Sequence, residues 1–490
     1  MAAVVRRGFG RVTDALAERL GRACARVSTN LSIRDRHGDD ESYHAAMPPD
    51  VVAYAACERE VVAVVRLCAE ARVPLIPFGT GTSLEGHIQA PYGGVCLDLS
   101  EMAAILEVNE EDMDARVQAG VTRGALNAHL RHTGLSFPID PGADASLGGM
   151  AACGASGTAA VRYGTMRENV LGATVVLADG SVMRTGGRAR KSSAGYDLTR
   201  LLVGSEGTLG VITELQLRLH PLPAAASAAV CTFPTLADGA CAVAALVHSG
   251  VALARCELLD ASSIAAFNAY PKEAPDMQLA PTLFLEFAGV SDVAVAEDAR
   301  IAHACCADEG GGDFQFATGA DERRRLWAAR HTLYYASLAL RPGSRGIVTD
   351  AAVPLSRLAE LMAQTAADVT AEAVVGPIFG HAGDGNFHVI LPVLPADPPD
   401  YVARLRRIND RLIRRTLAAG GTCTGEHGVG AGKRSYMTLQ HGDAAVGAMR
   451  AIKRALDPLN IMNPGKVMPD ADGDGEGQAE KSAARAELNE

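Results

Sequence analysis

The sequence lacks several features that would assign it quickly to a class. None of its 11 cysteines belongs to a C-x-x-C pair and their number is odd, which argues against a disulfide framework or a thiolate zinc site and indicates reduced thiols inside a cell. No apolar run reaches about 18 residues, so no membrane span is expected. Lys and Arg total 46 against 57 Asp and Glu, a net charge of −11, which argues against nucleic acid as the main partner.

Glycine, by contrast, is abundant, with 51 in 490 residues, within a composition of 48% hydrophobic and 21% charged residues. This composition is typical of globular proteins and excludes wholesale disorder. Between about 50 and 222 the glycines separate short predicted strands, such as 73–78 and a hairpin over 170–186. From about 223 to 420, alanine-rich helices alternate with strands, and we find no internal repeat. The pattern predicts an α+β fold with at least two domains.

The two ends of the chain differ from the rest. Residues 1–13 carry three arginines and no acid, which fits a mitochondrial-type presequence but also an ordinary helix start, since Asp14 and Glu18 follow. Residues 469–490 carry seven acids and two bases without apolar periodicity. This composition predicts a disordered acidic tail.

Three loops rich in small residues lie in the glycine-rich half, at 77–86, 141–158 and 203–213. Backbone amides at this density can bind an anion, because no side chain blocks the approach of a phosphate. A P-loop is excluded because His87 follows Gly86 where lysine is needed, and the order of strand and helix differs from a Rossmann motif. Close contact with an extended ligand is the simplest explanation for loops of this length.

In this order, the three loops resemble those of flavoproteins of the vanillyl-alcohol-oxidase type. The resemblance implies a two-part FAD-binding domain, an α+β (ferredoxin-like) substrate or cap domain and a C-terminal helical segment, with FAD bound non-covalently. The domains expected are 1–46 (N-terminal helical segment), 47–222 (FAD-binding), 223–420 (substrate or cap), 421–468 (completing the active site) and 469–490 (tail). The residues that it places along FAD are Pro77, Gly79, Thr80, Gly81, Thr82, Ser83, Pro141, Gly142, Ser146, Gly149, Gly154, Ser156, Thr158, Tyr163, Gly207, Ile212 and Asn463.

Two further motifs concentrate histidine and carboxylate. In Gly380-His-Ala-Gly-Asp-Gly-Asn-Phe-His388, a turn followed by a strand allows His381 and His388 to converge. In Gly425-Glu-His-Gly-Val-Gly430, Glu426 and His427 stand between glycines. Two imidazoles and a carboxylate are a common ligand set for a catalytic divalent metal with open positions. From the residues alone, two hydrogen-bonded core histidines and a loop glutamate remain an equal alternative.

These two motifs resemble the signatures of FAD-dependent D-2-hydroxyacid dehydrogenases. The resemblance implies that His381, His388 and Glu426 bind Zn²⁺ or Mn²⁺, which would act as a Lewis acid on the substrate. It makes His427 the general base, a role that suits an imidazole with an ordinary pKa of about 6.5.

The only tryptophan, Trp327, shares one face of a predicted helix with Arg330 and Tyr334. A core aromatic beside a surface arginine is the plain structural interpretation. An arginine on an aromatic face also suits bidentate binding of a carboxylate, and the resemblance favours Arg330 in that catalytic role. The substrate contacts expected are Arg330, Trp327, Arg345 and Asn386.

Among these dehydrogenases, the sequence most resembles D-lactate dehydrogenases of the cytochrome-linked type. The implied activity is oxidation of D-lactate or a similar D-2-hydroxy acid to the 2-oxo acid, with electrons leaving to cytochrome c, a quinone or an electron-transfer flavoprotein. Glycolate or D-2-hydroxyglutarate dehydrogenase, a flavin oxidase that uses O₂, and a non-catalytic flavin-binding subunit stay open as alternatives. The expected location is cytoplasmic, including the membrane periphery, with mitochondria as the alternative. A homodimer is a further alternative for the oligomeric state.

Overall fold

The computed structural model describes residues 8–271 and 275–469, apart from three side chains in one helix. The chain forms two compact units. Unit 1 contains the described residues up to Ala155, then Thr165–Pro221, and those from Glu426 onward. Unit 2 contains Ser156–Gly164 and Leu222–Gly425. Residues 1–7, at the start of the predicted N-terminal segment, and residues 470–490 of the predicted tail lie outside the described residues.

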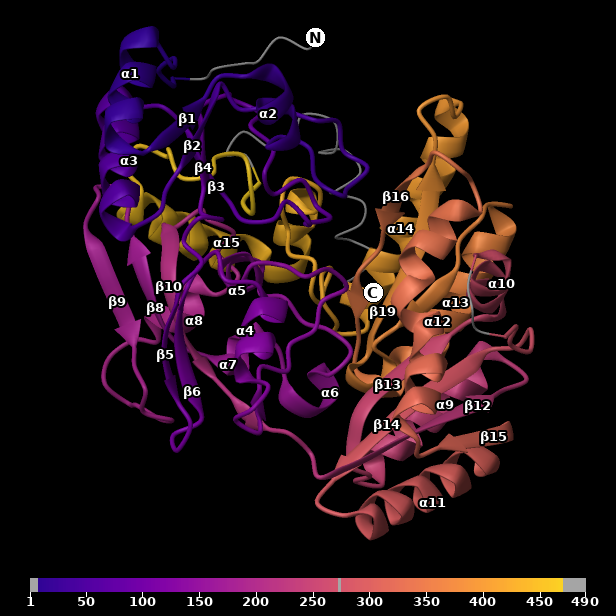
Figure 1. Ribbon diagram of the computed structural model, residues 1–490. Coiled ribbons are helices and arrows are strands. Elements are labelled where there is room, and N and C mark those ends of the chain that lie inside the picture. Colours follow the sequence, from indigo (N-terminus) through magenta and orange to yellow (C-terminus); the bar gives the residue numbers. More distant parts are fainter. Residues whose placement is uncertain (1–7, 272–274, 470–490) are drawn as a thin grey trace. The chain divides into compact units, whose positions relative to one another are not determined.

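The first sheet of unit 1 has four strands, in the order β1-β2-β4-β3 (Figure 1). β2, β4 and β3 run parallel, and β1 pairs with β2 antiparallel. The strands are β1 (Arg26–Ser28), β2 (Val51–Tyr54), β3 (Leu75–Phe78) and β4 (Val95–Asp98). Their residues Val51, Leu75, Val95 and Leu97 are fully buried, as expected for parallel strands covered on both faces.

The second sheet of unit 1 has five antiparallel strands, in the order β5-β6-β10-β8-β9. The strands are β5 (Ile105–Asn109), β6 (Asp114–Gln118), β8 (Val170–Val176), β9 (Val182–Gly186) and β10 (Val211–Arg218). The hairpin predicted over 170–186 is confirmed, with Gly180 in its turn at φ +77°. A short pair, β7 (Leu135–Ser136) and β11 (His220–Pro221), lies apart from these sheets.

Helices connect and cover the strands of unit 1. In Figure 1, α1 and α3 lie side by side, and α3 buries Val61, Val64 and Val65 against the parallel strands. The helices are α1 (Asp14–Ala23), α2 (Leu31–Arg36), α3 (Glu58–Ala71), α4 (Arg123–Leu130), α5 (Leu147–Cys153), α7 (Met166–Asn169), α8 (Leu198–Leu202), η2 (Arg434–Tyr436) and α15 (Met437–Leu456).

Unit 2 contains one large antiparallel sheet in the order β15-β12-β14-β13-β18-β19-β16. Its first half has the chain order β12, α9, β13, α10 (Ala261–Ala269), β14, α11, β15. In the sheet these four strands lie in the order 4-1-3-2, which is the ferredoxin-like arrangement. α11 packs on β12 and β14 (Figure 1). The elements are β12 (Ala225–Thr232), α9 (Leu236–His248), β13 (Leu253–Leu259), β14 (Thr282–Gly289), α11 (Asp292–Asp308) and β15 (Gly312–Ala317).

The second half of unit 2 repeats the same connectivity up to its second helix. β16 is followed by α13, β18, β19 and α14, and the strands lie in the sheet in the order β18-β19-β16. An isolated bridge pairs Thr422 with Ala352 at the position where a fourth strand would pair. The structure thus reveals an internal repeat that the sequence does not. Its elements are β16 (Arg345–Val348), β17 (Ala351–Ala352), α13 (Leu355–Ala371), β18 (Ile378–Gly380), η1 (Ala382–Asp384), β19 (Asn386–Val393) and α14 (Pro399–Ala418).

Three more helices complete unit 2: α6 (Ala160–Tyr163), α10 (Ala261–Ala269) and α12 (Ala320–Ala339). α12 packs against α10 and β19. The mixture of parallel and antiparallel sheets with helices confirms the predicted α+β class. Among the described residues, no helix has both the length and the apolar character required to cross a bilayer.

Candidate active site

The three glycine-rich loops meet within unit 1. A Cβ on Gly79 of the first loop would lie 2.3 Å from Ser146 Oγ of the second. A Cβ on Gly207 of the third would lie 3.0 Å from Pro77 Cγ of the first. The Gly204 amide donates to Ala151 O at 2.9 Å, which joins the third loop to the second. A Cβ at Gly79 or Gly207 would therefore crowd a side-chain atom of the neighbouring loop, and the φ of +71° at Gly207 also favours glycine.

Asn463 connects the C-terminal segment to the same loops. Its amide donates to Leu75 O at 2.8 Å, and its side-chain Nδ2 donates to Glu206 O at 2.8 Å and His87 O at 3.1 Å. Its Oδ1 is buried and accepts no hydrogen bond from the described residues. An unsatisfied buried acceptor is costly, so this atom fits a site built to receive a donor from a bound group such as FAD.

Most of the residues expected along FAD belong to unit 1. Gly79, Gly81, Thr82 and Ser83 are half-buried, and Thr80 is exposed. Ser146 caps α5, accepting from the Gly149 amide at 3.4 Å. Ser156, Thr158 and Tyr163, in contrast, belong to unit 2. The expected residues located in unit 1 are Pro77, Gly79, Thr80, Gly81, Thr82, Ser83, Pro141, Gly142, Ser146, Gly149, Gly154, Gly207, Ile212 and Asn463.

In unit 2, His381 and His388 lie together where β18 leads through η1 into β19. Their ring centroids are 5.7 Å apart at 86°, and both residues are buried, with exposed fractions of 6% and 3%. The tight turn depends on Gly385, at φ +82°, where a Cβ would lie 2.1 Å from Val353 O.

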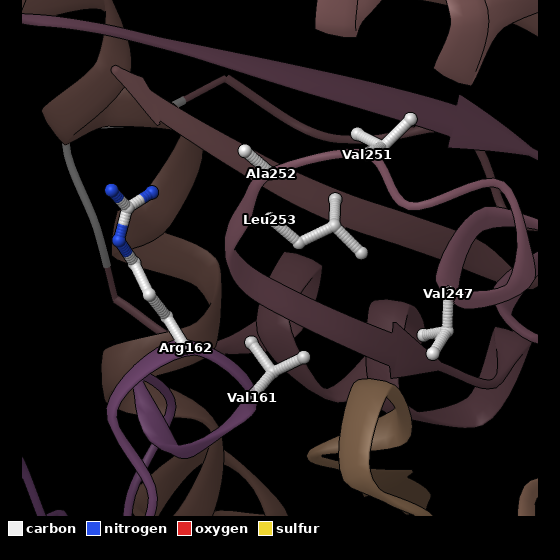
Figure 2. Close-up of a pocket in the computed structure, with 6 residues that line it drawn as sticks. All are labelled: Val161, Arg162, Val247, Val251, Ala252 and Leu253. Carbon is white, nitrogen blue, oxygen red and sulfur yellow. The ribbon is translucent and has the colours of Figure 1, made fainter. Parts of the chain in front are cut away.

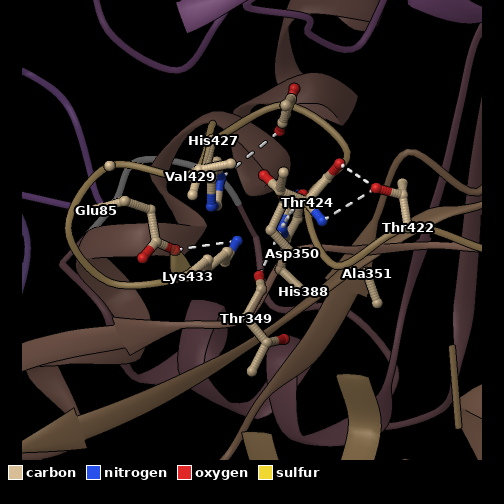
Figure 3. Close-up of polar contacts among 12 residues, drawn as sticks. Glu85, Thr349, Asp350, Ala351, His388, Thr422, Thr424, His427, Val429 and Lys433 are labelled. Atoms are coloured by element: carbon tan, nitrogen blue, oxygen red, sulfur yellow. Dashed lines mark hydrogen bonds and ion pairs between the residues drawn. The ribbon is translucent and has the colours of Figure 1, made fainter. Parts of the chain in front are cut away.

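The Nδ1 atoms of both imidazoles are anchored by acceptors. His381 Nδ1 lies 2.6 Å from Glu257 Oε1. His388 Nδ1 lies 2.9 Å from Thr349 O, a contact that Figure 3 shows. Carbonyl and carboxylate oxygens accept hydrogen bonds and cannot donate them, so Nδ1 is the donor. In the neutral ring, the lone pair is then on Nε2. This is the arrangement that prepares a histidine to bind a metal.

Glu257, on β13, is a site residue that the sequence interpretation missed. It is fully buried, and its Oε2 accepts from Arg330 Nε at 2.6 Å while Oε1 binds His381. Burial raises the pKa of Glu257, but Arg330 and His381 outweigh it and hold the pKa below its ordinary value. A lone carboxylate inside an apolar strand (Leu253–Leu259) is the signal that could have identified it.

A second buried carboxylate, Asp350, lies beside His388. Asp350 Oδ1 is 3.7 Å from His388 Nδ1 and accepts from Asn386 Nδ2 at 2.8 Å. Asp350 Oδ2 accepts from Thr424 Oγ1 at 2.6 Å, and Thr422 Oγ1 donates to Thr424 O (Figure 3). The Oδ1 of Asn386 is buried and accepts no hydrogen bond from any described residue, which leaves an acceptor for a ligand.

The residues expected to bind substrate occupy three elements of unit 2, namely α12, β16 and β19, which begins at Asn386. Trp327 and Arg330 lie on α12; Trp327 is buried at 4% exposure, with its ring centroid 6.2 Å from that of Phe284. The Arg330 guanidinium stacks over the Phe379 ring at 5.0 Å. Arg345 is half-buried on β16.

Glu426 and His427 follow Gly425 directly and belong to unit 1. His427 Nε2 is 3.9 Å from Glu426 Oε1, and both side chains are largely buried. The loop continues to Lys433, whose Nζ forms a buried ion pair with Glu85 at 3.0 Å (Figure 3). The amides of Ala431 and Gly432 also donate to Glu85 O.

Unit 2 also contains a small cavity. It is lined by apolar residues of α6, the end of α9 and the start of β13, with the Arg162 side chain beside it (Figure 2). Arg162 Nη1 donates to Ala288 O at 2.6 Å. None of the expected substrate or metal residues lines this cavity.

Comparisons with known proteins assign both parts of the chain to protein families. Residues 49–186 match the family model described as FAD binding domain, and residues 222–467 match FAD linked oxidases, C-terminal domain. The second match covers half of the chain. The chain belongs to the FAD-linked oxidase family. The expected flavoprotein family is therefore confirmed.

Curated relatives of this FAD-linked oxidase extend over most of its length. It is 48% identical to a probable mitochondrial D-lactate dehydrogenase of Danio rerio, over 90% of the chain and 89% of the relative. It is 43% identical to a mitochondrial D-lactate dehydrogenase [cytochrome] of Arabidopsis thaliana, over 90% and 78%. A glycolate oxidase subunit of Bacillus subtilis is 34% identical, over 88% and 91%.

Solved structures establish the fold independently. p-Cresol methylhydroxylase matches with a TM-score of 0.75 at 19% identity, covering 94% of this chain and 99% of its own. Alkyldihydroxyacetonephosphate synthase matches with a TM-score of 0.73 at 19% identity, covering 94% and 87%. At this identity the match concerns the fold alone, and it confirms the vanillyl-alcohol-oxidase type.

Proposed function

We propose that this FAD-linked oxidase is a D-lactate dehydrogenase that oxidises D-lactate to pyruvate and passes the electrons to a separate acceptor. The observation that carries the proposal is the pair His381 and His388, with both Nδ1 atoms anchored, in a chain with 48% identity to a D-lactate dehydrogenase relative. A non-catalytic flavin-binding subunit would have no need for two anchored imidazoles.

FAD is the cofactor that fits unit 1. The meeting of the three glycine loops supports binding of its diphosphate by Gly79, Thr80, Gly81, Thr82 and Ser83, and Asn463 Oδ1 supplies an acceptor. When bound, FAD supplies the hydride acceptor for the substrate carbon. We propose non-covalent attachment, because His87 is buried in an ion pair with Glu206 at 3.1 Å.

A divalent cation, Zn²⁺ or Mn²⁺, is the second cofactor that we propose. His381 and His388 would bind it through Nε2, and Glu426 would supply the carboxylate ligand. Imidazole and carboxylate donors suit both ions. The cation would supply Lewis acidity at the substrate hydroxyl.

The remaining residues have roles that follow from their chemistry. Arg330 would bind the substrate carboxylate while Glu257 fixes its guanidinium, with Trp327 providing an apolar wall and Arg345 and Asn386 additional polar contacts. His427 would remove the hydroxyl proton at an imidazole nitrogen. Since no second redox cofactor is predicted, the electrons leave to a partner; the relatives named D-lactate dehydrogenase [cytochrome] favour a cytochrome, with a quinone or an electron-transfer flavoprotein as alternatives.

The same relatives favour a mitochondrial location over the cytoplasmic one. A homodimer is part of the proposal only as an alternative to a monomer, and sedimentation of the purified protein distinguishes the two.

Purified flavoprotein should reduce an artificial dye with D-lactate and not with L-lactate. We expect the largest kcat/KM for D-lactate in a panel that also contains glycolate and D-2-hydroxyglutarate, with bleaching of the flavin absorbance on anaerobic addition of substrate. The similarity to the Bacillus subtilis glycolate oxidase subunit makes glycolate an alternative substrate. A preference for glycolate in this panel would replace D-lactate as the proposed substrate. Rapid peroxide release in air would make the protein an oxidase, and an unbleached flavin with every acid would reject catalysis.

Removal of the cation should inactivate the enzyme without removing FAD. We expect protein dialysed against a chelator to lose at least about tenfold in kcat, because the Lewis acid contributes several kcal/mol of charge stabilisation. Zn²⁺ or Mn²⁺, added back, should restore turnover, and Mg²⁺ serves as a control because it favours oxygen ligands. Full activity of verified metal-free protein would reject the metal site.

A further inference from the structure

Glu206, in the third glycine loop, has a buried carboxylate with three partners and a backbone carbonyl with a fourth. Its Oε1 accepts from the Val429 amide and its Oε2 from the Gly430 amide, each at 2.7 Å. Its Oε2 is also 3.1 Å from His87 Nε2, and its backbone carbonyl accepts from Asn463 Nδ2. All of these residues belong to unit 1. One side chain therefore joins the third loop, the first loop and the segment that carries His427.

The backbone around Glu206 is arranged for this carboxylate. Glu206 has φ +54°, a left-handed conformation that costs a non-glycine residue free energy. Opposite it, a Cβ on Gly428 would lie 2.8 Å from both Glu206 Oε1 and His87 Nε2. Glu206 adopts a backbone conformation that glycine reaches more easily, and it faces Gly428, where a Cβ would clash with it. This combination indicates that the Glu206 side chain is needed.

The charge state of Glu206 suits strong hydrogen bonds. Burial raises its pKa, but His87 and the two amides outweigh burial and lower it, so the carboxylate is ionised at neutral pH. Burial alone would lower the pKa of His87. The interaction with Glu206 outweighs burial, so the pKa of His87 is raised above its ordinary value. Hydrogen bonds to an ionised acceptor are about twice as strong as neutral ones.

We propose that Glu206 is a positioning residue for His427, holding the backbone two and three residues after it and thereby fixing the direction of the imidazole. The role rests on the proposed function, in which His427 is the base. Glu206 itself does not touch the reacting atoms; it acts through residues 428–430.

The test compares Glu206→Gln with Glu214→Gln in the flavin-loaded enzyme. A glutamine offers one acceptor and one donor to two amide donors, so one hydrogen bond is lost and a repulsion replaces it. We expect kcat per bound flavin to fall about 10- to 100-fold with KM for D-lactate little changed, since misplacing a catalytic group by about 1 Å can cost about 10²-fold. The isotope effect with 2-deuterated D-lactate should rise. Glu214, paired with Arg116 on the surface of β10, should give wild-type values.

Two further measurements separate positioning from a merely structural role. Hydrogen exchange of the Val429 and Gly430 amides should become faster in Glu206→Gln, a readout that requires no turnover. The double variant Glu206→Gln/His427→Ala should be no slower than His427→Ala alone, because Glu206 acts only through His427. Where the glutamine variant does not fold, Glu206→Asp keeps the charge but is too short to reach both amides, and the same losses are expected.

Unchanged kcat per flavin, or unchanged exchange at residues 429 and 430, would overturn the proposal. A lower melting temperature with normal turnover would make Glu206 structural only. If His427→Ala keeps its activity while the exchange result holds, the base assignment in the proposed function fails and the anchoring of the loop stands.

Discussion

Replacement of His427 by alanine should lower kcat about 10³-fold while the protein keeps its flavin. A positioned general base contributes typically about 10² to 10⁴, and the substrate hydroxyl cannot lose its proton to water at a comparable rate. FAD should stay bound because the loops that we assign to it are held by Ser146, Gly204 and Asn463 and not by this imidazole. Stopped-flow reduction of the flavin by D-lactate measures the effect directly.

The control for this variant is His129→Ala, which truncates an exposed histidine on α4. It should leave flavin reduction unchanged. Added imidazole should partly restore turnover to His427→Ala, since it supplies the missing base to the space vacated by the side chain. Flavin reduction within threefold of wild type in His427→Ala would show that another group removes the proton.

The local features of the fold could be predicted because they depend on residues close in sequence. Alternating and periodic apolar residues were enough for β3 and for the β8–β9 hairpin. The glycine loops were recognisable because small residues without apolar periodicity have no packing role. The family resemblance then supplied the order of the domains.

The partners of the site residues could not be predicted, because they come from distant strands. Glu257 lies 124 positions from His381, and nothing in the local pattern around either residue specifies the pairing. Glu206 reaches residues 223 and 224 positions away. The internal repeat of unit 2 is hidden for a related reason, since strand order is a property of pairing and not of composition.

The Glu257→Gln variant should lose both stability and metal affinity. Glu257 forms ion pairs with both Arg330 and His381, and its side chain is 0% exposed while that of Arg330 is 14% exposed. Removing one partner of a buried pair leaves the other charge uncompensated and costs about 3–5 kcal/mol. The free energy of unfolding of the metal-free protein, measured in urea, should fall by about this amount.

Glutamine also changes how His381 meets the metal. The carboxylate orients the ring and makes Nε2 more basic, whereas an amide oxygen accepts the Nδ1 hydrogen more weakly, so the affinity for Zn²⁺ should fall about 10- to 100-fold. The matched control is Glu286→Gln on the neighbouring strand β14. Glu286 binds Arg255 at 2.9 Å, but both side chains are partly exposed. Loss of this ion pair should therefore cost about 1 kcal/mol or less of stability and leave the Zn²⁺ affinity unchanged. A loss of stability in Glu257→Gln with normal Zn²⁺ affinity would assign Glu257 to Arg330 alone and remove it from the metal site.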